Sequence, residues 1–392
     1  MDIQRDEGFQ SHTIARLFGD GFSAATDVQL LYKGHDSFDT IFNALRKAER
    51  LICLEFYIFR NDGTGEELAE ILREKSSQGV QVYLLHDHFG SIGTPRKFWQ
   101  GLRTAGVQIR ASRPFKWSSP FHYVHRDHKK LIIIDNKRAF TGGLNIANEY
   151  RGFHLRRKSR GWRDTGVMLE GPIVGRLFDI FRKSWTTWGG GGIAWSPGAG
   201  KEEQHRTGAI SLPAIPIFVS SSRGRRRLRR ILFYSINHAV QSIFITTAYF
   251  TPSWRMVQTL EDAVARGVRV RLLVPGETDV PAAAYAGKSF FTRLLRAGAE
   301  IYTYRGSMLH AKSFIFDECW SIVGSTNLDF QSLRYNDEGN VGILDRGFAS
   351  EMTAIFDEDL SHSVQILRED WDQRPFSEKA KEFFYSLFRR RL

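Results

Sequence analysis

The chain carries the same short pattern twice, and this repetition constrains its fold more than any other feature. In each copy a histidine is followed two residues later by a lysine and seven residues later by an aspartate. The two copies are His128, Lys130 and Asp135, and His310, Lys312 and Asp317. In both copies a small-residue turn begins fourteen residues after the histidine, at Gly142-Gly143 and at Gly324-Ser325. Equal spacings in two copies predict a protein built from two similar halves.

Each half alternates apolar, strand-like runs with amphipathic helical stretches, in the same order. The first half is expected to have strands at 28–32, 51–59, 80–85 and 130–135, with helices at 37–49, 65–78 and 95–104. The second half is expected to have strands at 217–219, 242–250, 268–274 and 312–317, with helices at 225–240, 253–266 and 290–297. This alternation predicts parallel β-α-β units whose helices cover both faces of each sheet. The expected fold class is α/β, with two similar α/β/α sandwich domains.

A glycine-rich segment separates the two halves. It contains Gly189-Gly-Gly-Gly192 and Ser196-Pro-Gly-Ala-Gly200, a composition typical of a flexible linker. The boundary is expected between residues 190 and 212. This places one domain at 1–195 and the other at 210–392.

Charge and cysteine content limit the kinds of partner and compartment. The net charge of +12 indicates an anionic partner, and both nucleic acid and anionic lipid meet that requirement. The two cysteines, Cys53 and Cys319, lie in apolar stretches and are expected to be reduced thiols, which excludes a disulfide framework. No apolar run reaches about 18 residues, so no transmembrane helix is expected. The acidic start of the chain does not resemble a secretory signal.

The repeated residues suit chemistry on a phosphate. On a strand, residues two apart face the same way, so each motif histidine shares a face with its lysine. The small residues that follow, including Ser325, let the backbone approach a bound phosphate, and Asn145 and Asn327 add amide donors. A lone histidine is more often an ordinary core or surface residue, but the duplicated context favours catalysis by His128 and His310.

With these motifs the chain resembles the phospholipase D superfamily over essentially its whole length. The resemblance implies two α/β/α halves related by a pseudo-twofold axis, with both motifs meeting at the interface. One histidine would attack phosphorus to form a phosphohistidine, and the other would protonate the leaving alkoxide and then deprotonate the incoming hydroxyl. The two lysines and two asparagines would stabilise the charge on the non-bridging oxygens. No metal and no cofactor is expected.

The resemblance also assigns acids to the histidines. Asp164 and Glu338 match the positions of the downstream acids that hold the second ring nitrogen in this family, although ordinary ion pairing is the competing interpretation. Asp135 and Asp317 belong to the catalytic motif, yet they are better interpreted as structural partners of backbone or basic groups.

Several local segments are similar to the bacterial cardiolipin synthase branch, in particular to its short members without N-terminal membrane spans. They are residues 142–150, 162–165, 170–172, 248–252 and 324–329. The implied function is a phosphatidyltransferase that makes cardiolipin, with a phospholipase D-type hydrolase, a metal-independent nuclease or a non-catalytic binding protein as alternatives. The implied partners are phospholipid substrates and an anionic phospholipid membrane surface, with nucleic acid unfavoured. The expected location is peripheral, on the cytoplasmic face of the bacterial cell membrane.

Four further segments leave alternatives open. The stretch 377–392 has one apolar stripe (Ala380, Phe383, Phe384, Leu387 and Phe388) followed by arginines, which indicates either an interfacial helix or a helix packed on the core. The aromatic, basic loop 115–123 either lines an acyl-chain entrance or packs over the domain seam. The arginine run at 223–230 either binds anions or forms a solvated helix face. His122, His125 and His128 are spaced by three, but the second half has no counterpart, so a metal site is not expected there.

Overall fold

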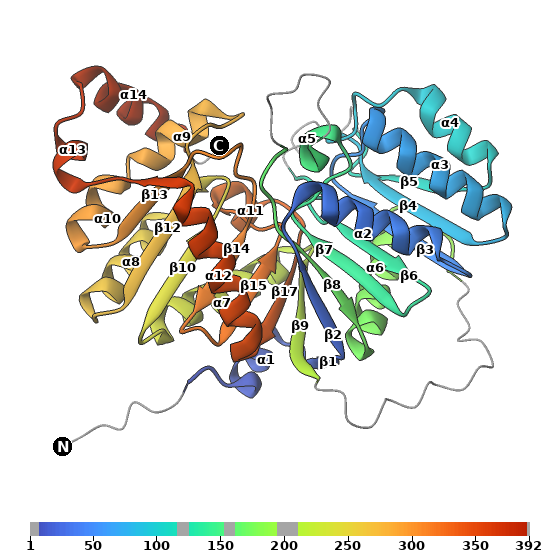
Figure 1. The fold of residues 1–392 in the computed structure, drawn as a ribbon, viewed down its shortest axis with the longest axis horizontal. Coiled ribbons are helices and arrows are strands. Elements are labelled where there is room, and N and C mark those ends of the chain that lie inside the picture. Colours follow the sequence, from blue (N-terminus) through green and yellow to red (C-terminus); the bar gives the residue numbers. More distant parts are fainter. Residues whose placement is uncertain (1–7, 116–124, 153–160, 194–210, 390–392) are drawn as a thin grey trace.

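The computed structural model describes residues 8–115, 125–152, 161–193 and 211–389. Two β-sheets lie side by side, one in each half of the molecule, with helices over their outer faces (Figure 1). The segment 116–124, the segment 153–160 and the expected linker region 194–210 lie outside the described residues.

The two sheets repeat one strand order. Within the described residues the first sheet has, in spatial order, β2 (Asp27–Leu31), β8 (Gly166–Glu170), β7 (Arg138–Gly142), β6 (Leu131–Ile134), β3 (Leu51–Phe56), β4 (Gln81–Asp87) and β5 (Gln108–Ser112). The corresponding strands of the second sheet are β9 (Leu212–Val219), β17 (Glu338–Leu344), β15 (Trp320–Gly324), β14 (Ser313–Phe316), β10 (Ser242–Thr246), β12 (Arg269–Pro275) and β13 (Glu300–Tyr304). The second sheet is extended at its edges by β1 (Ser23–Ala25) and β18 (Ser363–Gln365), and a separate two-stranded ladder joins β11 (Phe250–Thr251) to β16 (Leu328–Asp329).

The prediction of parallel β-α-β units is correct for only part of each sheet. β3, β4 and β5 are parallel, as are β10, β12 and β13. The strands that carry the motifs, β6 and β14, instead pair antiparallel on both sides. The reason is the short connection from β6 to β7, at residues 135–137, because only an antiparallel pair can be joined by a tight hairpin.

Helices cover both faces of each sheet, as the α/β/α expectation requires. The helices of the first half are α2 (Gly34–Arg46), α3 (Gly63–Ser77), α4 (Arg96–Thr104), α5 (Asn148–Arg151) and α6 (Pro172–Thr187). Those of the second half are α7 (Ser222–His238), α8 (Trp254–Ala265), α9 (Pro281–Lys288), α10 (Phe291–Ala297), α11 (Phe330–Arg334), α12 (Arg346–Ser361), α13 (Arg368–Asp372) and α14 (Phe376–Ser386). Several begin at a side-chain cap; Asp62, for example, accepts a hydrogen bond from the Gly65 N–H at the start of α3.

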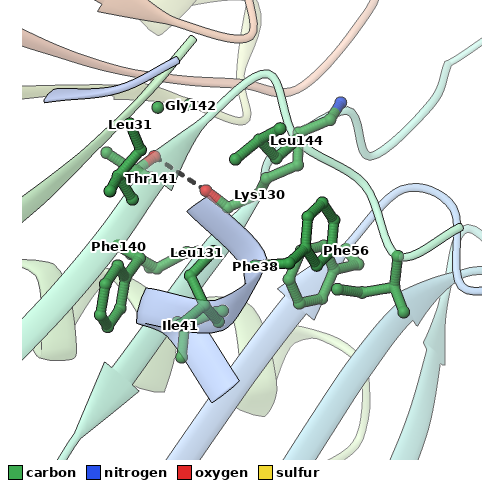
Figure 2. Close-up of a pocket in the computed structure, with 13 residues that line it drawn as sticks. Leu31, Phe38, Ile41, Phe56, Lys130, Leu131, Phe140, Thr141, Gly142 and Leu144 are labelled. Atoms are coloured by element: carbon green, nitrogen blue, oxygen red, sulfur yellow. Dashed lines mark hydrogen bonds between the residues drawn. The ribbon is translucent and has the colours of Figure 1, made fainter. Parts of the chain in front are cut away.

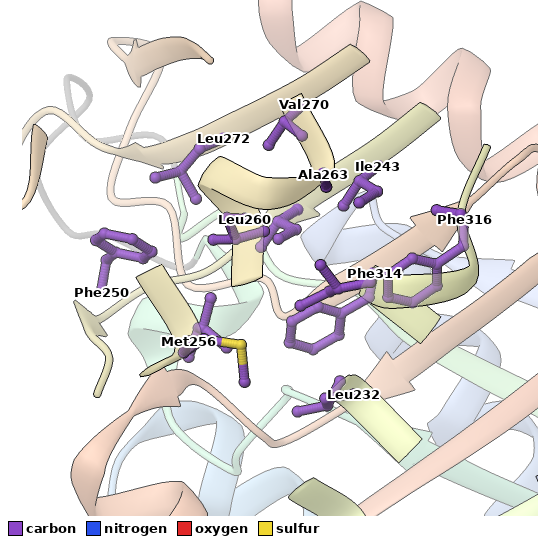
Figure 3. Close-up of a cluster of buried hydrophobic side chains, with 14 of the residues drawn as sticks. Leu232, Ile243, Phe250, Met256, Leu260, Ala263, Val270, Leu272, Phe314 and Phe316 are labelled. Carbon is purple, nitrogen blue, oxygen red and sulfur yellow. The ribbon is translucent and has the colours of Figure 1, made fainter. Parts of the chain in front are cut away.

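Three apolar cores hold these layers together. One lies between the first sheet and α2, α3 and α4, and a second lies between the second sheet and α7, α8 and α10 (Figure 3). The third contains residues of both sheets together with α6 and α12, so the inner faces of the two halves share a core. Alternation along the buried strands makes this possible: Ile52 faces the first core and Cys53 faces the shared one.

The chain crosses between the halves near its start. α1 (Ser11–Phe18) packs with α7, and β1 pairs with β9 of the second sheet. Residues 11–25 fall within the expected first domain by position, but they add to the sheet and core of the second half. Among the described helices, none combines the length and the apolar character needed to cross a bilayer.

Candidate active site

The two motif histidines lie where the halves meet. His128 comes shortly before β6 and His310 shortly before β14, in equivalent positions of the two sheets. The main-chain N–H of His128 donates to the carbonyl oxygen of Asp337 at 2.8 Å, and that of His310 donates to the carbonyl oxygen of Arg163 at 2.7 Å. Each histidine is therefore held at the backbone by a segment of the opposite half.

The side chain of each histidine is likewise held by a residue of the opposite half. Nδ1 of His128 lies 3.1 Å from Oε2 of Glu338, and Nδ1 of His310 lies 2.6 Å from Oδ2 of Asp164. The four side chains are buried. The sequence predicts both acids but not the pairing across the halves, in which the acid of one copy serves the histidine of the other. A carboxylate on Nδ1 selects the tautomer whose Nε2 carries the free lone pair.

Both imidazoles line one cavity of about 690 Å³, which both halves enclose. Asn145 and Asn327 also line it, as the sequence predicts. The carboxamide Oδ1 of Asn145 accepts from the Ile58 N–H at 3.0 Å, which leaves Nδ2 free to donate, here to the Tyr150 hydroxyl at 2.8 Å. The cavity volume lies within the range of small-molecule sites.

Four aromatic residues of the cavity wall are missing from the sequence-based candidates. Tyr57 meets the His128 ring edge-on with centroids 5.1 Å apart, and Tyr249 meets the His310 ring in the same way at 6.2 Å. The ring centroids of Tyr150 and Trp162 each lie 5.3 Å from the centroid of the His310 ring. A direct comparison of the two repeats could have found Tyr57 and Tyr249, since each comes soon after the corresponding strand, β3 or β10. Tyr150 and Trp162 have no such internal counterpart.

Two arginines add positive charge to the first-half wall of the cavity. Arg60 pairs with Glu149 at 3.1 Å, and Arg126 lies over the Phe89 ring at 4.2 Å. On the opposite wall, Asp329 caps α11, and burial raises its pKa to about 7. Isolated arginines carry no motif, so the sequence does not single these out.

The motif lysines are buried behind the histidines and are absent from the cavity lining. The ammonium of Lys130 donates to the main-chain oxygen of His128 at 2.7 Å, and that of Lys312 lies 2.6 Å from Nδ1 of His310. Burial lowers the pKa of Lys130 to about 7 and the pKa of Lys312 to about 8. Below these pKa values each lysine carries a positive charge, which acts on the site at short range through a poorly screened interior.

Burial also favours the neutral form of the histidines. It lowers the pKa of His310 to about 4 and the pKa of His128 well below its usual value, and the neighbouring lysines act in the same direction. A neutral imidazole is the form that can attack phosphorus or accept a proton. Burial raises the pKa of Glu338 to about 7. For Asp164 the charge of Lys312 and the hydrogen bond with His310 outweigh burial and hold the pKa below its usual value.

The structure does not place Asp135 and Asp317 with the other predicted catalytic residues. They lie at the far end of β6 and β14 and do not line the cavity. The Asp135 carboxylate accepts hydrogen bonds from the N–H groups of residues 49, 50 and 51 at 2.8–2.9 Å. The Asp317 carboxylate accepts from those of residues 240, 241 and 242 at 2.8–3.1 Å. The alternative interpretation, a structural partner of the backbone, is the one that the contacts support.

Ser325 is also placed differently from its prediction as a phosphate ligand. It is buried and absent from the cavity lining, and its hydroxyl donates to Oε2 of Glu338 while accepting from the Gly339 N–H at 3.0 Å. The equivalent residue in the first half is Gly143, where an added Cβ would come within 1.9 Å of Asp164 Oδ1. The small residues of both turns therefore make room for the acids that hold the histidines.

The other sequence candidates lie around the site. Nδ1 of His125 is 2.7 Å from the Tyr335 carbonyl oxygen, while His122 and most of the loop 115–123 fall outside the described residues. In the arginine run, Arg225 is buried and pairs with Asp337 at 3.2 Å, whereas Arg226 and Arg230 are exposed. The run is thus partly internal, and only some of its members face solvent.

A second pocket lies beside Lys130 but is too small for a lipid chain. Its walls are apolar, with Phe38, Ile41 and Phe140 among them, and the Thr141 hydroxyl donates to the Lys130 main-chain oxygen at 2.8 Å across one side (Figure 2). The volume is about 20 Å³, which is room for roughly one water molecule.

Comparison with known proteins agrees with this arrangement. Residues 41–159 and 232–360 match the family described as cardiolipin synthase, PLD-like domain. The probable cardiolipin synthase YwiE of Bacillus subtilis is 33% identical over 371 residues, which are 93% of this chain and 72% of the relative. Cardiolipin synthase A of Pseudomonas putida is 33% identical over 353 residues, covering 88% of this chain and 71% of the relative.

The fold has a close structural match at low sequence identity. A phosphatidylserine synthase of Haemophilus influenzae superposes with a TM-score of 0.75 at 15% identity, covering 97% of this chain and 100% of the other. That match supports the two-halved phospholipase D-like fold, and the family match covers the motif of each half. The chain belongs to the cardiolipin synthase family of phospholipase D-like proteins.

Proposed function

We propose that this chain is a phosphatidyltransferase that makes cardiolipin by moving a phosphatidyl group from one phospholipid to a hydroxyl of another. The observation that carries the proposal is the pair of imidazoles, contributed by separate halves, on one cavity. Two imidazoles on one cavity suit a reaction that needs both a nucleophile and a proton donor at the same phosphorus, with the nucleophile in the neutral form and the donor in the protonated form.

The proposed reaction has two displacements. In the first, Nε2 of one neutral histidine attacks phosphorus and the bond to the leaving alkoxide breaks. The other histidine enters this step as the imidazolium and gives the alkoxide its Nε2 proton. In the second, the now neutral histidine takes the proton of the incoming lipid hydroxyl, whose oxygen attacks phosphorus and breaks the P–N bond. Either histidine can be the nucleophile on the contacts described, and each is oriented by its acid, Glu338 or Asp164.

Negative charge on the phosphoryl oxygens is met by donors and cations around the site. Asn145 and Asn327 lie on the cavity wall, and Lys130 and Lys312 lie directly behind the histidines. Electrostatic stabilisation of this kind is commonly the largest contribution to catalysis. We propose that these four residues take the role that a metal ion plays in other phosphotransferases.

The proposed place of action is the surface of a phospholipid membrane, peripherally on the cytoplasmic face of the bacterial cell membrane. The net charge of +12 supports this placement, because the cytoplasmic leaflet is negatively charged. Nucleic acid, the other partner compatible with the charge, is not proposed as a substrate.

The test is to incubate purified protein with phosphatidylglycerol vesicles in a chelator and to analyse the lipids by mass spectrometry. We expect cardiolipin and glycerol, with loss of roughly 1,000-fold or more in rate for His128→Ala and for His310→Ala. Phosphatidic acid as the only lipid product would instead identify a hydrolase. Mass mapping of a quenched reaction should find a phosphatidyl group on one of the two histidines.

A further inference from the structure

Helix α14 has its apolar face turned outward. Of its described residues, the one fully buried is Glu382, while five large apolar side chains in and just after the helix are exposed. Their exposed fractions are 83% for Phe376, 70% for Phe383, 55% for Phe384, 64% for Leu387 and 45% for Phe388. These five residues are called here the α14 apolar face. Contiguous apolar surface of this kind on a soluble domain indicates an interaction site.

Polar and aromatic contacts outside the α14 apolar face attach α14 to the protein. Arg374 donates to Glu382 at 2.8 and 3.2 Å, and its guanidinium lies 3.3 Å from the centroid of the Trp371 ring. Tyr385 stacks on Tyr285 of α9 with centroids 5.6 Å apart and an interplanar angle of 17°. The alternative of a helix that packs its stripe on the core, left open by the sequence, does not agree with these contacts.

The α14 apolar face lies beside the active site. α14 packs along α9, and Val280 and Ala283 at the start of α9 line the catalytic cavity. α14 and α9 also lie side by side along the upper edge in Figure 1. A surface that holds α14 therefore also lies close to the wall of the cavity.

Basic residues border the α14 apolar face. Lys381 and Lys288 both lie over the Tyr285 ring, and Arg389 lies 5.1 Å from the ring of Trp254, which is itself 48% exposed. Within residues 376–389 three residues are basic and two are acidic. Exposed aromatic and aliphatic side chains flanked by lysine and arginine match the boundary between acyl chains and anionic headgroups.

We propose that the α14 apolar face inserts into the surface of an anionic phospholipid bilayer and holds the catalytic cavity next to it. This inference deepens the proposed function and rests on it for the substrate. A second copy of the chain is a less suitable occupant, because the basic residues around the face would repel their own copies.

The experiment compares the full chain with Phe383→Ser/Leu387→Ser. The control, Val240→Ser/Val364→Ser, also removes two exposed apolar side chains, of 53% and 52% exposure, outside α14. Binding is measured by co-sedimentation with phosphatidylglycerol/phosphatidylcholine vesicles, and turnover is measured on vesicles and on monomeric short-chain phosphatidylglycerol. We expect the α14 variant to lose about tenfold or more in vesicle affinity and in vesicle turnover while keeping short-chain turnover, and the control to match the parent chain.

Each other outcome has a definite meaning. Equal vesicle affinity of the α14 variant and the parent chain would overturn the membrane proposal, as would a change limited to self-association in analytical ultracentrifugation. If the α14 variant loses vesicle binding while no protein turns over any lipid, the docking inference stands and the proposed function fails. Circular dichroism of both variants checks that the fold is unchanged.

Discussion

The two histidine–carboxyl pairs share one geometry but differ in charge state. Asp164 stays ionised because Lys312 and His310 lie beside it, whereas burial raises the pKa of Glu338 to about 7. Near pH 6, His310 therefore has an anionic partner, while the partner of His128 is a neutral carboxylic acid. A neutral carboxyl is a weaker acceptor for the Nδ1–H of His128 than a carboxylate is.

We expect this difference to appear in the pH dependence of kcat/KM. Below pH 7 Glu338 is protonated and His128 is less well oriented, so the rate should rise as the pH increases through about 7. In Glu338→Gln this acidic limb should disappear, with a lower rate throughout. Asp164→Asn is the matched control, because Asp164 is already ionised across this range; its rate should fall while the limb stays. An unchanged limb in Glu338→Gln, measured on short-chain phosphatidylglycerol, would contradict this assignment.

The β6–β7 hairpin shows how an element is held in place for the site. Asp135 and Asn136 both have positive φ, at 53°, and Asp317 and Glu318 of the β14–β15 hairpin are alike, at 51° and 48°. Aspartate adopts this left-handed region more readily than most residues. The Asp135 carboxylate accepts hydrogen bonds from three backbone N–H groups at the start of β3, and the Asp317 carboxylate accepts from three at the start of β10. The motif aspartate thus fastens the histidine-bearing strand to its neighbour.

Asp135→Ala should therefore act on stability and not on chemistry. The loss of three hydrogen bonds to a charged acceptor should lower the free energy of unfolding by about 2–3 kcal/mol. Urea denaturation followed by tryptophan fluorescence measures this, and Asp317→Ala should behave in the same way. The fraction that remains folded should retain the parent kcat. A stable Asp135→Ala protein without turnover would restore the aspartate to the catalytic set.

At the scale of the whole molecule, buried ion pairs join the halves around the site. Arg163 donates to both carboxylate oxygens of Asp359 at 2.8 and 2.7 Å, and also to the main-chain oxygen of Asp164 at 2.6 Å. Arg113 of the first half pairs with Asp337 of the second at 2.6 Å. Together with the shared apolar core, these contacts make the position of each acid dependent on the assembly of both halves.

Arg163→Leu should lower the free energy of unfolding by about 3–5 kcal/mol, because it leaves the Asp359 carboxylate buried without its partner. Turnover should fall as well, since Arg163 holds the backbone next to Asp164. The double variant Arg163→Leu/Asp359→Leu should recover part of the stability, because no unpaired charge remains. Guanidinium unfolding of the three proteins tests this. Additive losses in the double variant would show that the pair contributes nothing through its contact.

The repeat is sufficient to predict two α/β/α halves and the pair of histidines, because both follow from spacing along the chain, whereas the two acids beside the histidines are predicted only through the family resemblance. It does not predict which acid serves which histidine, because that pairing arises between segments about 146 and 210 residues apart. The sequence does not predict the antiparallel strands, because the alternation of helices and strands favours parallel pairing and the hairpins at β6–β7 and β14–β15 are short. Tyr150, Trp162, Arg60 and Arg126 carry no motif, and their place on the cavity wall depends on tertiary packing.

Each acid contacts the histidine of the opposite half, and this arrangement has a consequence for the two copies of the repeat. A duplicated gene usually frees one copy to change, but here each copy supplies the part that makes the other copy's histidine useful. We therefore expect the loss of either acid to act on the histidine of the opposite half. The two contacts also differ in size, because the longer acid, Glu338, has a hydroxyl partner in Ser325, whereas Asp164 lies against the glycine at 143.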